Sequence, residues 1–181
     1  LGSPDCSECA VDCVSECFAV FANAVHAREA FETVLAALTD PVNGLIRLLT
    51  PPFDGKTRNA VGYIEGYLPG VRENGGQYTH AAAWCIIAAC RLGMADTADS
   101  LFKMINPIEH GSANSIERYK GEPYAVAGDV YSVGRLAGRA GWTLYTGSAA
   151  WLYRAAVENI LGIRKRGTKL FVEPCTVLDA F

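Results

Sequence analysis

The strongest constraint on the fold is an alanine-rich apolar segment at residues 79–92. Its residues are nearly all alanine, isoleucine, tryptophan and cysteine, and they lie on every side of a helical projection. A helix that is apolar on most sides is usually buried in a core. Gly93 ends this segment, and a second helical segment then runs from Ala95 to Met104, where Asn106-Pro107 ends it. We therefore expect an antiparallel helical hairpin.

Other helices and strands are expected on both sides of this hairpin. From about Val11 to Leu38, apolar residues recur at intervals of three and four without Gly or Pro, which predicts one long helix. A second strong helix is expected over residues 148–161, and residues 123–130 are a candidate helix start. The expected extended segments are residues 45–49 and a C-terminal hairpin whose strands, 161–164 and 169–172, flank a turn at 165–168.

The composition excludes several classes of protein. Half of the 181 residues are apolar, which is enough for one domain with a substantial core. The net charge is −3 and the charged residues are scattered, so a basic stripe for nucleic acid or a polybasic membrane patch is lacking. No stretch approaches the roughly 20 apolar residues that span a bilayer, and the first residues lack a signal-peptide pattern. We expect a soluble cytoplasmic chain that binds no nucleic acid and does not insert into a membrane.

The seven cysteines favour reduced thiols over a disulfide framework. Their number is odd, and Cys85, Cys90 and Cys175 stand in apolar contexts. Four others stand at short spacing near the N-terminus, namely Cys6, Cys9, Cys13 and Cys17. Thiolates at such spacing can hold zinc or an iron–sulfur cluster. However, Cys13 and Cys17 are four residues apart on one expected helix, whereas metal knuckles usually pair their ligands across a turn. We therefore expect no metal site.

Two polar motifs stand at the starts of two expected helices. Residues 72–80, Arg-Glu-Asn-Gly-Gly-Gln-Tyr-Thr-His, place a carboxylate, two amides and an imidazole around a paired-glycine turn. Residues 141–148, Gly-Trp-Thr-Leu-Tyr-Thr-Gly-Ser, open the last strong helix. The loop at residues 50–76 is long for an inert connection in a compact domain. Two helix starts that carry hydrogen-bond donors predict one shared ligand pocket.

These motifs resemble the C-terminal half of the catalytic domain of the family 94 glycoside phosphorylases. Three more motifs carry the resemblance in the same order, at residues 102–107 (Phe-Lys-Met-Ile-Asn-Pro), 119–124 (Tyr-Lys-Gly-Glu-Pro-Tyr) and 129–132 (Asp-Val-Tyr-Ser). The segments 44–54 (Gly-Leu-Ile-Arg-Leu-Leu-Thr-Pro-Pro-Phe-Asp) and 62–67 (Gly-Tyr-Ile-Glu-Gly-Tyr) most resemble the cyclic β-1,2-glucan synthase branch of this family. The resemblance covers about residues 12 to 175.

The resemblance implies a fold and a chemistry. It implies that residues 1–181 are the C-terminal portion of an all-α catalytic domain. This portion would be a partial (α/α)6 toroid of helical hairpins, with long loops at one rim and a short C-terminal β-hairpin. The implied reaction is phosphorolysis with inversion, in which inorganic phosphate attacks the anomeric carbon of a β-linked glucooligosaccharide. Phosphate is then a co-substrate, and no cofactor is expected.

The resemblance assigns the phosphate contacts to His80, Thr146 and Gly147. These residue types suit an anion, because an imidazole, a hydroxyl and the backbone N–H groups at a helix start all donate hydrogen bonds to it. The candidates for sugar binding are side chains that pair with hydroxyl groups or stack on a sugar ring: Glu73, Asn74, Gln77, Trp142 and Tyr145.

Most of these candidates also have a structural interpretation. The alternative for His80 is a core histidine, and the alternative for Glu73 is an ion pair with Arg72. Taken individually, Trp142 and Tyr145 suit a core position better than a ligand contact. Two further acids, Glu122 and Asp129, are expected to hold loops by accepting hydrogen bonds from backbone N–H groups.

An inverting mechanism also needs a general acid, which the resemblance places N-terminal to every motif above. We therefore expect no catalytic residue in this chain and no activity from it alone. A partial toroid would leave apolar edges that favour self-association or binding of the missing upstream segment. Two alternatives stay open, namely a non-catalytic carbohydrate-binding or structural module, and an enzyme assembled from two chains with the acid supplied in trans. In the synthase branch, this segment would belong to a membrane-associated protein.

Overall fold

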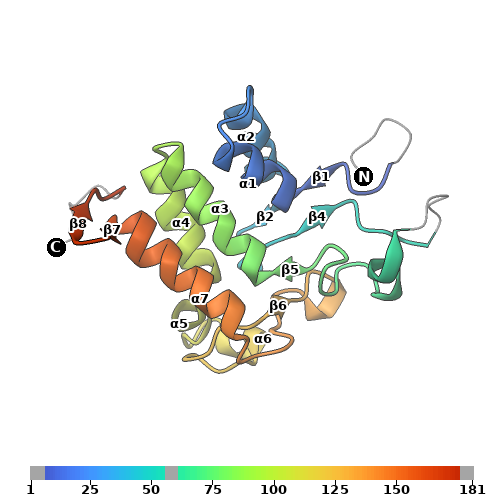
Figure 1. Ribbon diagram of the computed structural model, residues 1–181. Helices are drawn as coiled ribbons and strands as arrows, with labels where there is room; N and C mark the ends of the chain where they lie inside the picture. Colours follow the sequence, from blue (N-terminus) through green and yellow to red (C-terminus); the bar gives the residue numbers. More distant parts are fainter. Residues whose placement is uncertain (1–6, 56–60, 176–181) are drawn as a thin grey trace.

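The computed structural model describes residues 7–55 and 61–175, and most of its regular structure is helical. Helix α3 (Thr79–Arg91) lies at its centre and forms the expected antiparallel hairpin with α4 (Ala95–Ile105). Helix α7 (Thr146–Arg154) lies beside α3 and runs in the same direction (Figure 1). Gly93 ends α3 with a φ of 70°, and its N–H donates to the carbonyl of Cys90 at 3.1 Å. The expected central hairpin is therefore confirmed.

The long helix expected over residues 11–38 is wrong, because two helices occupy this region. Helix α1 (Cys13–Phe21) ends before a turn, and α2 (Ala27–Leu38) begins after it. Asn23 has a φ of 52°, and the Ala24 N–H donates to the carbonyl of Ala19 at 2.9 Å. This is the hydrogen bond of a Schellman motif, in which asparagine replaces the usual glycine. The absence of Gly and Pro therefore did not prevent a helix end.

The strands are short and form four antiparallel pairs in the described residues. Three of these pairs are β1 (Val11–Asp12) with β4 (Leu49–Thr50), β2 (Thr39–Asp40) with β3 (Leu45–Ile46), and β5 (Gln77–Tyr78) with β6 (Asp129–Val130). The fourth is the expected C-terminal hairpin, with strands β7 (Ile163–Arg166) and β8 (Lys169–Val172). Its turn is tighter than expected, because Gly167 adopts a φ of 59° and the strands close around two residues.

The helix considered for residues 123–130 is wrong. This segment ends in strand β6, whose backbone groups pair with β5. The N–H of Gly128 donates to the carbonyl of Trp142 at 2.5 Å, so it too serves a contact outside any helix. The helix expected over 148–161 is confirmed, with an earlier start at Thr146 and a final π-helical turn, Ala155–Ile160. The remaining short helices are α5 (Pro107–His110), α6 (Ile116–Tyr119), and two 3₁₀ turns, Gly62–Gly66 and Gly134–Leu136.

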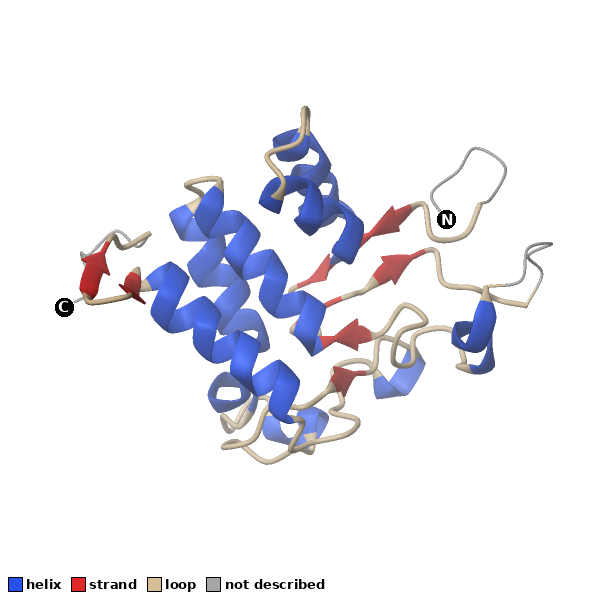
Figure 2. Cartoon of the chain, viewed as in Figure 1, coloured by secondary structure: helices blue, strands red, loops and turns tan. Residues whose placement is uncertain are grey.

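The main core joins α1, α2, α3 and α4, and α7 adds to it. Phe31, Leu38 and Ile86 are among its largest fully buried side chains. Figure 1 and Figure 2 show the longer loops and strands β1, β4, β5 and β6 on the side of the N-terminal ends of α3 and α7, whereas the β7–β8 hairpin lies at the opposite end. The long loops therefore collect at one end of the helices, where the two polar motifs lie.

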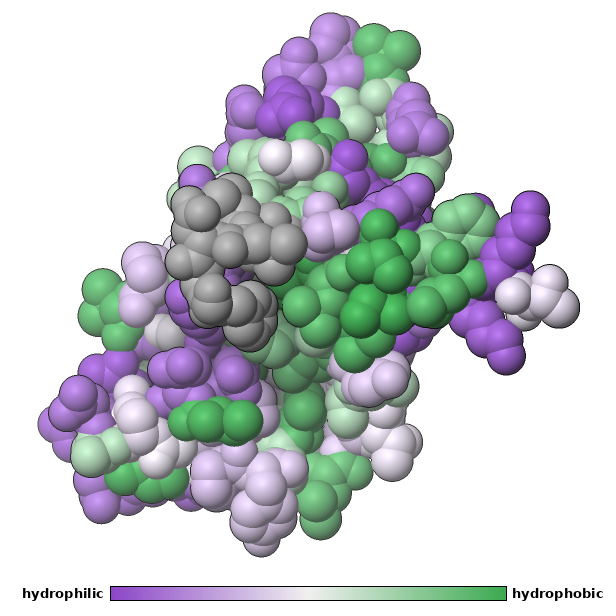
Figure 3. Space-filling view, turned by 90° about the vertical axis from the view of Figure 1, so that its left-hand side faces the viewer, coloured by the Kyte–Doolittle hydropathy of each residue, from purple (hydrophilic) through white to green (hydrophobic). Residues whose placement is uncertain are grey.

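Apolar side chains also reach the surface. Figure 3 shows the face near the C-terminal end, where an apolar area lies between polar ones. Large side chains exposed in the described residues include Phe18 (50%), Tyr153 (65%) and Leu170 (68%). The expected cover for such side chains, either a second copy of the chain or the upstream segment, stays a prediction. Among the described residues, no helix has the length and apolarity needed to cross a bilayer, and the cytoplasmic location stays a prediction as well.

Candidate functional site

The two polar motifs are joined through strand β6. In the β5–β6 pair, Tyr78 lies opposite Asp129. The Thr79 N–H, at the start of α3, donates to the carbonyl of Gly128 at 3.0 Å, and the Gly128 N–H donates to the carbonyl of Trp142 at 2.5 Å. These bonds connect residues 72–80 to residues 141–148 through the segment between them.

Asp129 holds this connection from the inside. It is buried, and its Oδ1 accepts a hydrogen bond from the Trp142 N–H at 2.9 Å. Burial raises the pKa of this carboxyl, and the Trp142 N–H opposes that shift. Gly141 permits the close approach, because a Cβ added there would lie 2.5 Å from both carboxylate oxygens. The expected loop-holding role of Asp129 is thus confirmed for its Oδ1. Its Oδ2, and Oε2 of the second acid, Glu122, are buried without a hydrogen-bond partner in the described residues.

The residues expected to contact phosphate lie together. A Cβ added to Gly147 would lie 3.6 Å from Nδ1 of His80, so the first turn of α7 adjoins the first turn of α3. Thr146 and Gly147 are both exposed. The first N–H groups of a helix have no partner within it, and the helix dipole gives this end a partial positive charge. The exposed start of α7 and the imidazole of His80 therefore lie side by side.

The imidazole of His80 is partly buried among aromatic rings. Its ring is parallel to that of Tyr78, with centroids 6.2 Å apart, and the centroids of Trp84 and Trp151 lie 4.8 and 5.7 Å away. Burial lowers the pKa of His80, which favours a neutral imidazole with one N–H donor. The rings hold the orientation of His80, while its position beside Gly147 leaves it near the helix start.

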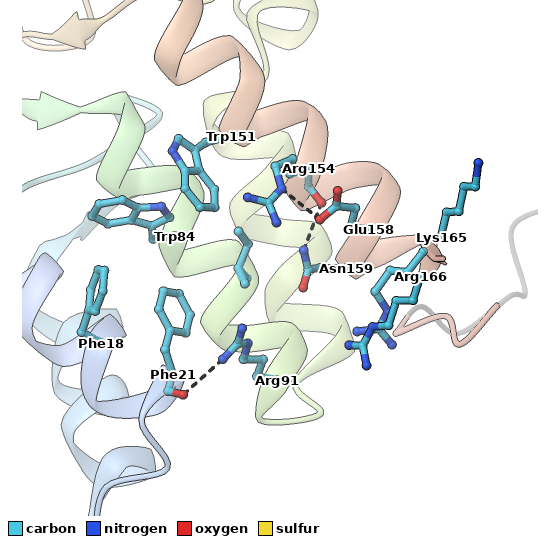
Figure 4. A pocket seen from close by; sticks show the side chains of 12 residues that line it. Phe18, Phe21, Trp84, Arg91, Trp151, Arg154, Glu158, Asn159, Lys165 and Arg166 are labelled. Atoms are coloured by element: carbon cyan, nitrogen blue, oxygen red, sulfur yellow. Dashed lines mark hydrogen bonds and ion pairs between the residues drawn. The ribbon is translucent and has the colours of Figure 1, made fainter. Parts of the chain in front are cut away.

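An open groove of about 490 Å³ continues from these rings along α3 and α7. Figure 4 shows Trp84 and Trp151 facing each other near one end, with Phe18 and Phe21 of α1 across from them. The other end is basic and includes side chains from α3, α7 and the C-terminal hairpin: Arg91, Arg154, Arg164, Lys165 and Arg166. The candidate phosphate residues therefore adjoin a surface with aromatic and cationic character.

Three sugar-binding candidates surround a cation that was not itself a candidate. The Arg72 guanidinium carbon lies 3.8 Å from the ring centroid of Trp142, and its Nε lies 3.4 Å from Oε2 of Glu73. Trp142 and Tyr145 lie with their ring centroids 5.8 Å apart. The ion pair between Arg72 and Glu73, named above as an alternative, is present. Trp142 is 57% exposed, which places an aromatic ring at the surface of this cluster.

Arg72 is the functional candidate that sequence reasoning missed. Its Nη1 is buried without a hydrogen-bond partner among the described residues, and its backbone φ is 49°. Burial opposes its charge, but the Tyr145 hydroxyl and the Glu73 carboxylate outweigh this and raise the pKa of Arg72. The motif shows Arg72 and Glu73 next to each other, but the aromatic neighbours Trp142 and Tyr145 come from far along the chain.

The two amide candidates are buried and already paired. Asn74 accepts a hydrogen bond from the Phe53 N–H at 2.8 Å and donates to the carbonyls of Phe53 (2.8 Å) and Tyr67 (2.7 Å). Gln77 accepts from the Ile46 N–H at 2.9 Å and donates to Oγ1 of Thr79 at 3.0 Å. Both amides therefore hold the turn and its neighbouring loops, and neither is presented to solvent.

The paired glycines of the first motif allow this turn to pack. Gly75 has a φ of 82°, and a Cβ there would lie 2.9 Å from Cβ of Pro52. A Cβ on Gly76 would lie 2.8 Å from the carbonyl oxygen of Arg72. Larger residues would push these backbone segments apart, so the two glycines let the turn close on itself and pack against Pro52.

Comparison with known proteins assigns this helical segment to a class of catalytic domain. A family model described as the glycosyl hydrolase 94 superfamily, catalytic domain, matches residues 1–162. The chain belongs to this superfamily.

Its relatives are of two kinds. The chain is 48% identical to a cyclic beta-(1,2)-glucan synthase of Rhizobium meliloti (strain 1021) over 96% of its own length. It is 31% identical to an N,N'-diacetylchitobiose phosphorylase of Vibrio proteolyticus over 72% of its length, and 29% identical to a solabiose phosphorylase of Paenibacillus borealis over the same share. The matched regions span 6% of the synthase, 16% of the first phosphorylase and 17% of the second.

Proposed function

We propose that this chain supplies the phosphate and sugar contacts of a glycoside phosphorylase-type catalytic domain, of the kind found in the cyclic β-1,2-glucan synthases. The observation that carries the proposal is the approach of Gly147 to within 3.6 Å of His80, measured from an added Cβ to Nδ1. The 48% identity to a synthase supports the choice of branch. The helical hairpins would then be the closing part of an (α/α)6 toroid.

Phosphate would bind where the first turns of α3 and α7 meet. His80 would donate one imidazole N–H, Thr146 would donate its hydroxyl hydrogen, and Gly147 would donate its backbone N–H. The helix dipole of α7 would add a favourable potential for the anion. Because these donors stand on two rigid helices, they would hold the attacking oxygen in a defined direction, which is how positioning accelerates a bimolecular step.

The sugar would lie on the side of Arg72 and Trp142. The exposed Trp142 ring offers a face for the apolar side of a sugar ring, and Glu73 and Tyr145 offer an acceptor and a hydroxyl. Asn74 and Gln77 would act by holding the turn that carries these groups. Proton donation to the leaving oxygen would come from a general acid outside this chain, so the chain by itself would bind without turnover.

A calorimetric titration of the chain with inorganic phosphate tests the phosphate site. His80→Ala and Thr146→Val should each weaken binding at least tenfold, because each removes one donor to the anion. His26→Ala is the matched control, since the His26 side chain is 78% exposed and lies outside the site. Equal affinities of the two histidine variants would refute the assigned contacts.

A second assay concerns turnover. We expect no glucose 1-phosphate from β-1,2-glucooligosaccharides and phosphate with the chain alone, and production of it when the upstream segment is added. Turnover by the chain alone would contradict the external general acid. Oligosaccharide binding that phosphate does not affect, together with no turnover in either case, would favour the non-catalytic carbohydrate-binding module.

A further inference from the structure

Three cysteine thiols from two helices meet inside the core. The Sγ atoms of Cys13 and Cys85 lie 3.1 Å apart, and those of Cys17 and Cys85 lie 3.7 Å apart. All three sulfur atoms lie within 4.8 Å of one another, and each side chain is completely buried. This three-thiol cluster lies outside the phosphate and sugar contacts, and the proposed function does not use it.

The tertiary structure creates the cluster. Cys13 and Cys17 are four residues apart and therefore lie on one face of α1. This face packs against α3, which brings in Cys85 from 68 and 72 residues away. The spacing that argued against a metal site within one helix becomes suitable when a second helix supplies the third sulfur.

We propose that Cys13, Cys17 and Cys85 form a three-sulfur site for a thiophilic metal ion, with copper(I) as the ion that fits best. Soft thiolate ligands select copper(I), zinc or iron–sulfur clusters. Structural zinc takes four ligands, whereas the group of potential metal-binding side chains found here in the described residues consists of three cysteines. Copper(I) accepts three sulfur ligands, and a fully buried site leaves no space for bulk water to complete a shell.

The distances suit this geometry. A metal–sulfur bond of about 2.3 Å corresponds to a sulfur–sulfur distance of about 4 Å in a trigonal arrangement. The observed 3.7 Å between Cys17 and Cys85 is close to this value, and the 3.1 Å between Cys13 and Cys85 needs a shift of less than about 1 Å.

Metal binding at this site would release protons. Each thiol has one hydrogen bond to another thiol that lowers its pKa and one that raises it. Burial raises the pKa further, so the pKa of all three thiols lies well above the usual range. The cluster is therefore neutral before the ion enters. Each thiol that becomes a thiolate transfers one proton to solvent and forms one copper–sulfur bond, while copper stays in the +1 state and no electron is transferred.

The test is an anaerobic titration of the reduced chain with copper(I) against a competing chelator, followed by X-ray absorption spectroscopy of the complex. We expect one ion per chain with three sulfur neighbours at about 2.3 Å. Cys13→Ala, Cys17→Ala and Cys85→Ala should each lower the affinity at least tenfold. Cys90→Ala is the matched control, because Cys90 stands on the same helix as Cys85 but outside the cluster.

Spectroscopy of the unaltered chain keeps the test decisive even if a core variant fails to fold. Absence of a stoichiometric ion, or a shell with fewer than three sulfur neighbours, would overturn the proposal. Equal loss of affinity in Cys90→Ala would overturn it as well. Phosphate titration of the copper-loaded and copper-free chain separates this result from the proposed function, since the thiol cluster and the phosphate contacts involve different residues.

Discussion

The guanidinium carbon of Arg72 lies 3.8 Å from the centre of the Trp142 ring. This cation–π contact joins the first residue of one polar motif to the second residue of the other. Such contacts contribute about 0.5–2 kcal/mol, depending on how well water is excluded. The contact therefore helps to keep the two motifs in one site, in addition to the backbone bonds through Gly128 and Asp129.

Replacing Arg72 should disturb both stability and sugar binding. We expect Arg72→Ala to lower the free energy of unfolding by about 1 kcal/mol, through loss of the contact with Trp142 and the ion pair with Glu73. Arg72→Lys should restore part of the stability but not the flat stacking of a guanidinium. Thermal unfolding and oligosaccharide titration would measure the two effects. Arg135→Ala, at an exposed position, should leave both unchanged, and an equal effect of this control would contradict the prediction.

Asn74→Ala should be more damaging than its location in a loop suggests. The substitution leaves the N–H and C=O of Phe53 and the carbonyl of Tyr67 without their amide partner. An unsatisfied buried group costs about 1–3 kcal/mol, so we expect a loss of at least about 2 kcal/mol in urea unfolding. Asn114→Ala, at an exposed position, provides the comparison and should change the stability by less than about 0.5 kcal/mol. Similar losses in the two variants would show that the amide of Asn74 does not hold the loop.

Gly141→Ala tests the packing around Asp129. The new methyl group would lie 2.5 Å from both carboxylate oxygens, so the carboxylate or the backbone must move and the bond to the Trp142 N–H is weakened. We expect destabilisation of about 1–3 kcal/mol, measured by thermal or urea unfolding. Gly66→Ala is the control, because a Cβ there meets no atom within 4 Å. A stable Gly141→Ala chain with unchanged phosphate binding would contradict this role.

The burial of His110 predicts that the folded chain loses stability in mild acid. Its side chain is buried and its ring is stacked on Tyr119, with centroids 4.5 Å apart. Burial lowers the pKa of His110 in the folded chain, whereas an unfolded histidine titrates near 6.5. The unfolded chain therefore binds more protons as the pH falls below about 6.5. Stability is lost with a limiting slope of about 1.4 kcal/mol per pH unit until the folded chain is also protonated.

Urea unfolding at pH 7.5 and 5.5 measures this effect. His110→Asn should be less stable than the unaltered chain at pH 7.5 but should show a smaller fall in stability toward pH 5.5. Burial lowers the pKa of His80 as well, so part of the pH dependence should remain in this variant. Asn114→Ala, at an exposed position without a titratable side chain, should keep the full dependence. An unchanged slope in His110→Asn would exclude His110 as a source of the acid sensitivity.

Local patterns along the chain were sufficient for several parts of the fold. The apolar residues of α3, Gly93 after it and the turn glycine Gly167 led to correct predictions of the central hairpin and the C-terminal strands. These features depend on neighbouring residues, because an apolar pattern on all sides of a helix and a positive φ are properties of a short segment. The motifs at 72–80 and 141–148 likewise led to the correct family.

Other features were decided by contacts between distant segments. Strand β6 formed where a helix was expected, because its backbone pairs with β5. Arg72 gained its surroundings from Trp142 and Tyr145.

The sequence by itself determined the family, the central helices and the identity of the polar motifs, since these follow from residue type and local spacing. Only the tertiary structure decided that Asn74 and Gln77 face inward, that His80 meets Gly147, and that α3 brings a third thiol to the two on α1. The physical reason is that burial and side-chain proximity depend on helix packing, which joins residues that sequence spacing leaves unrelated.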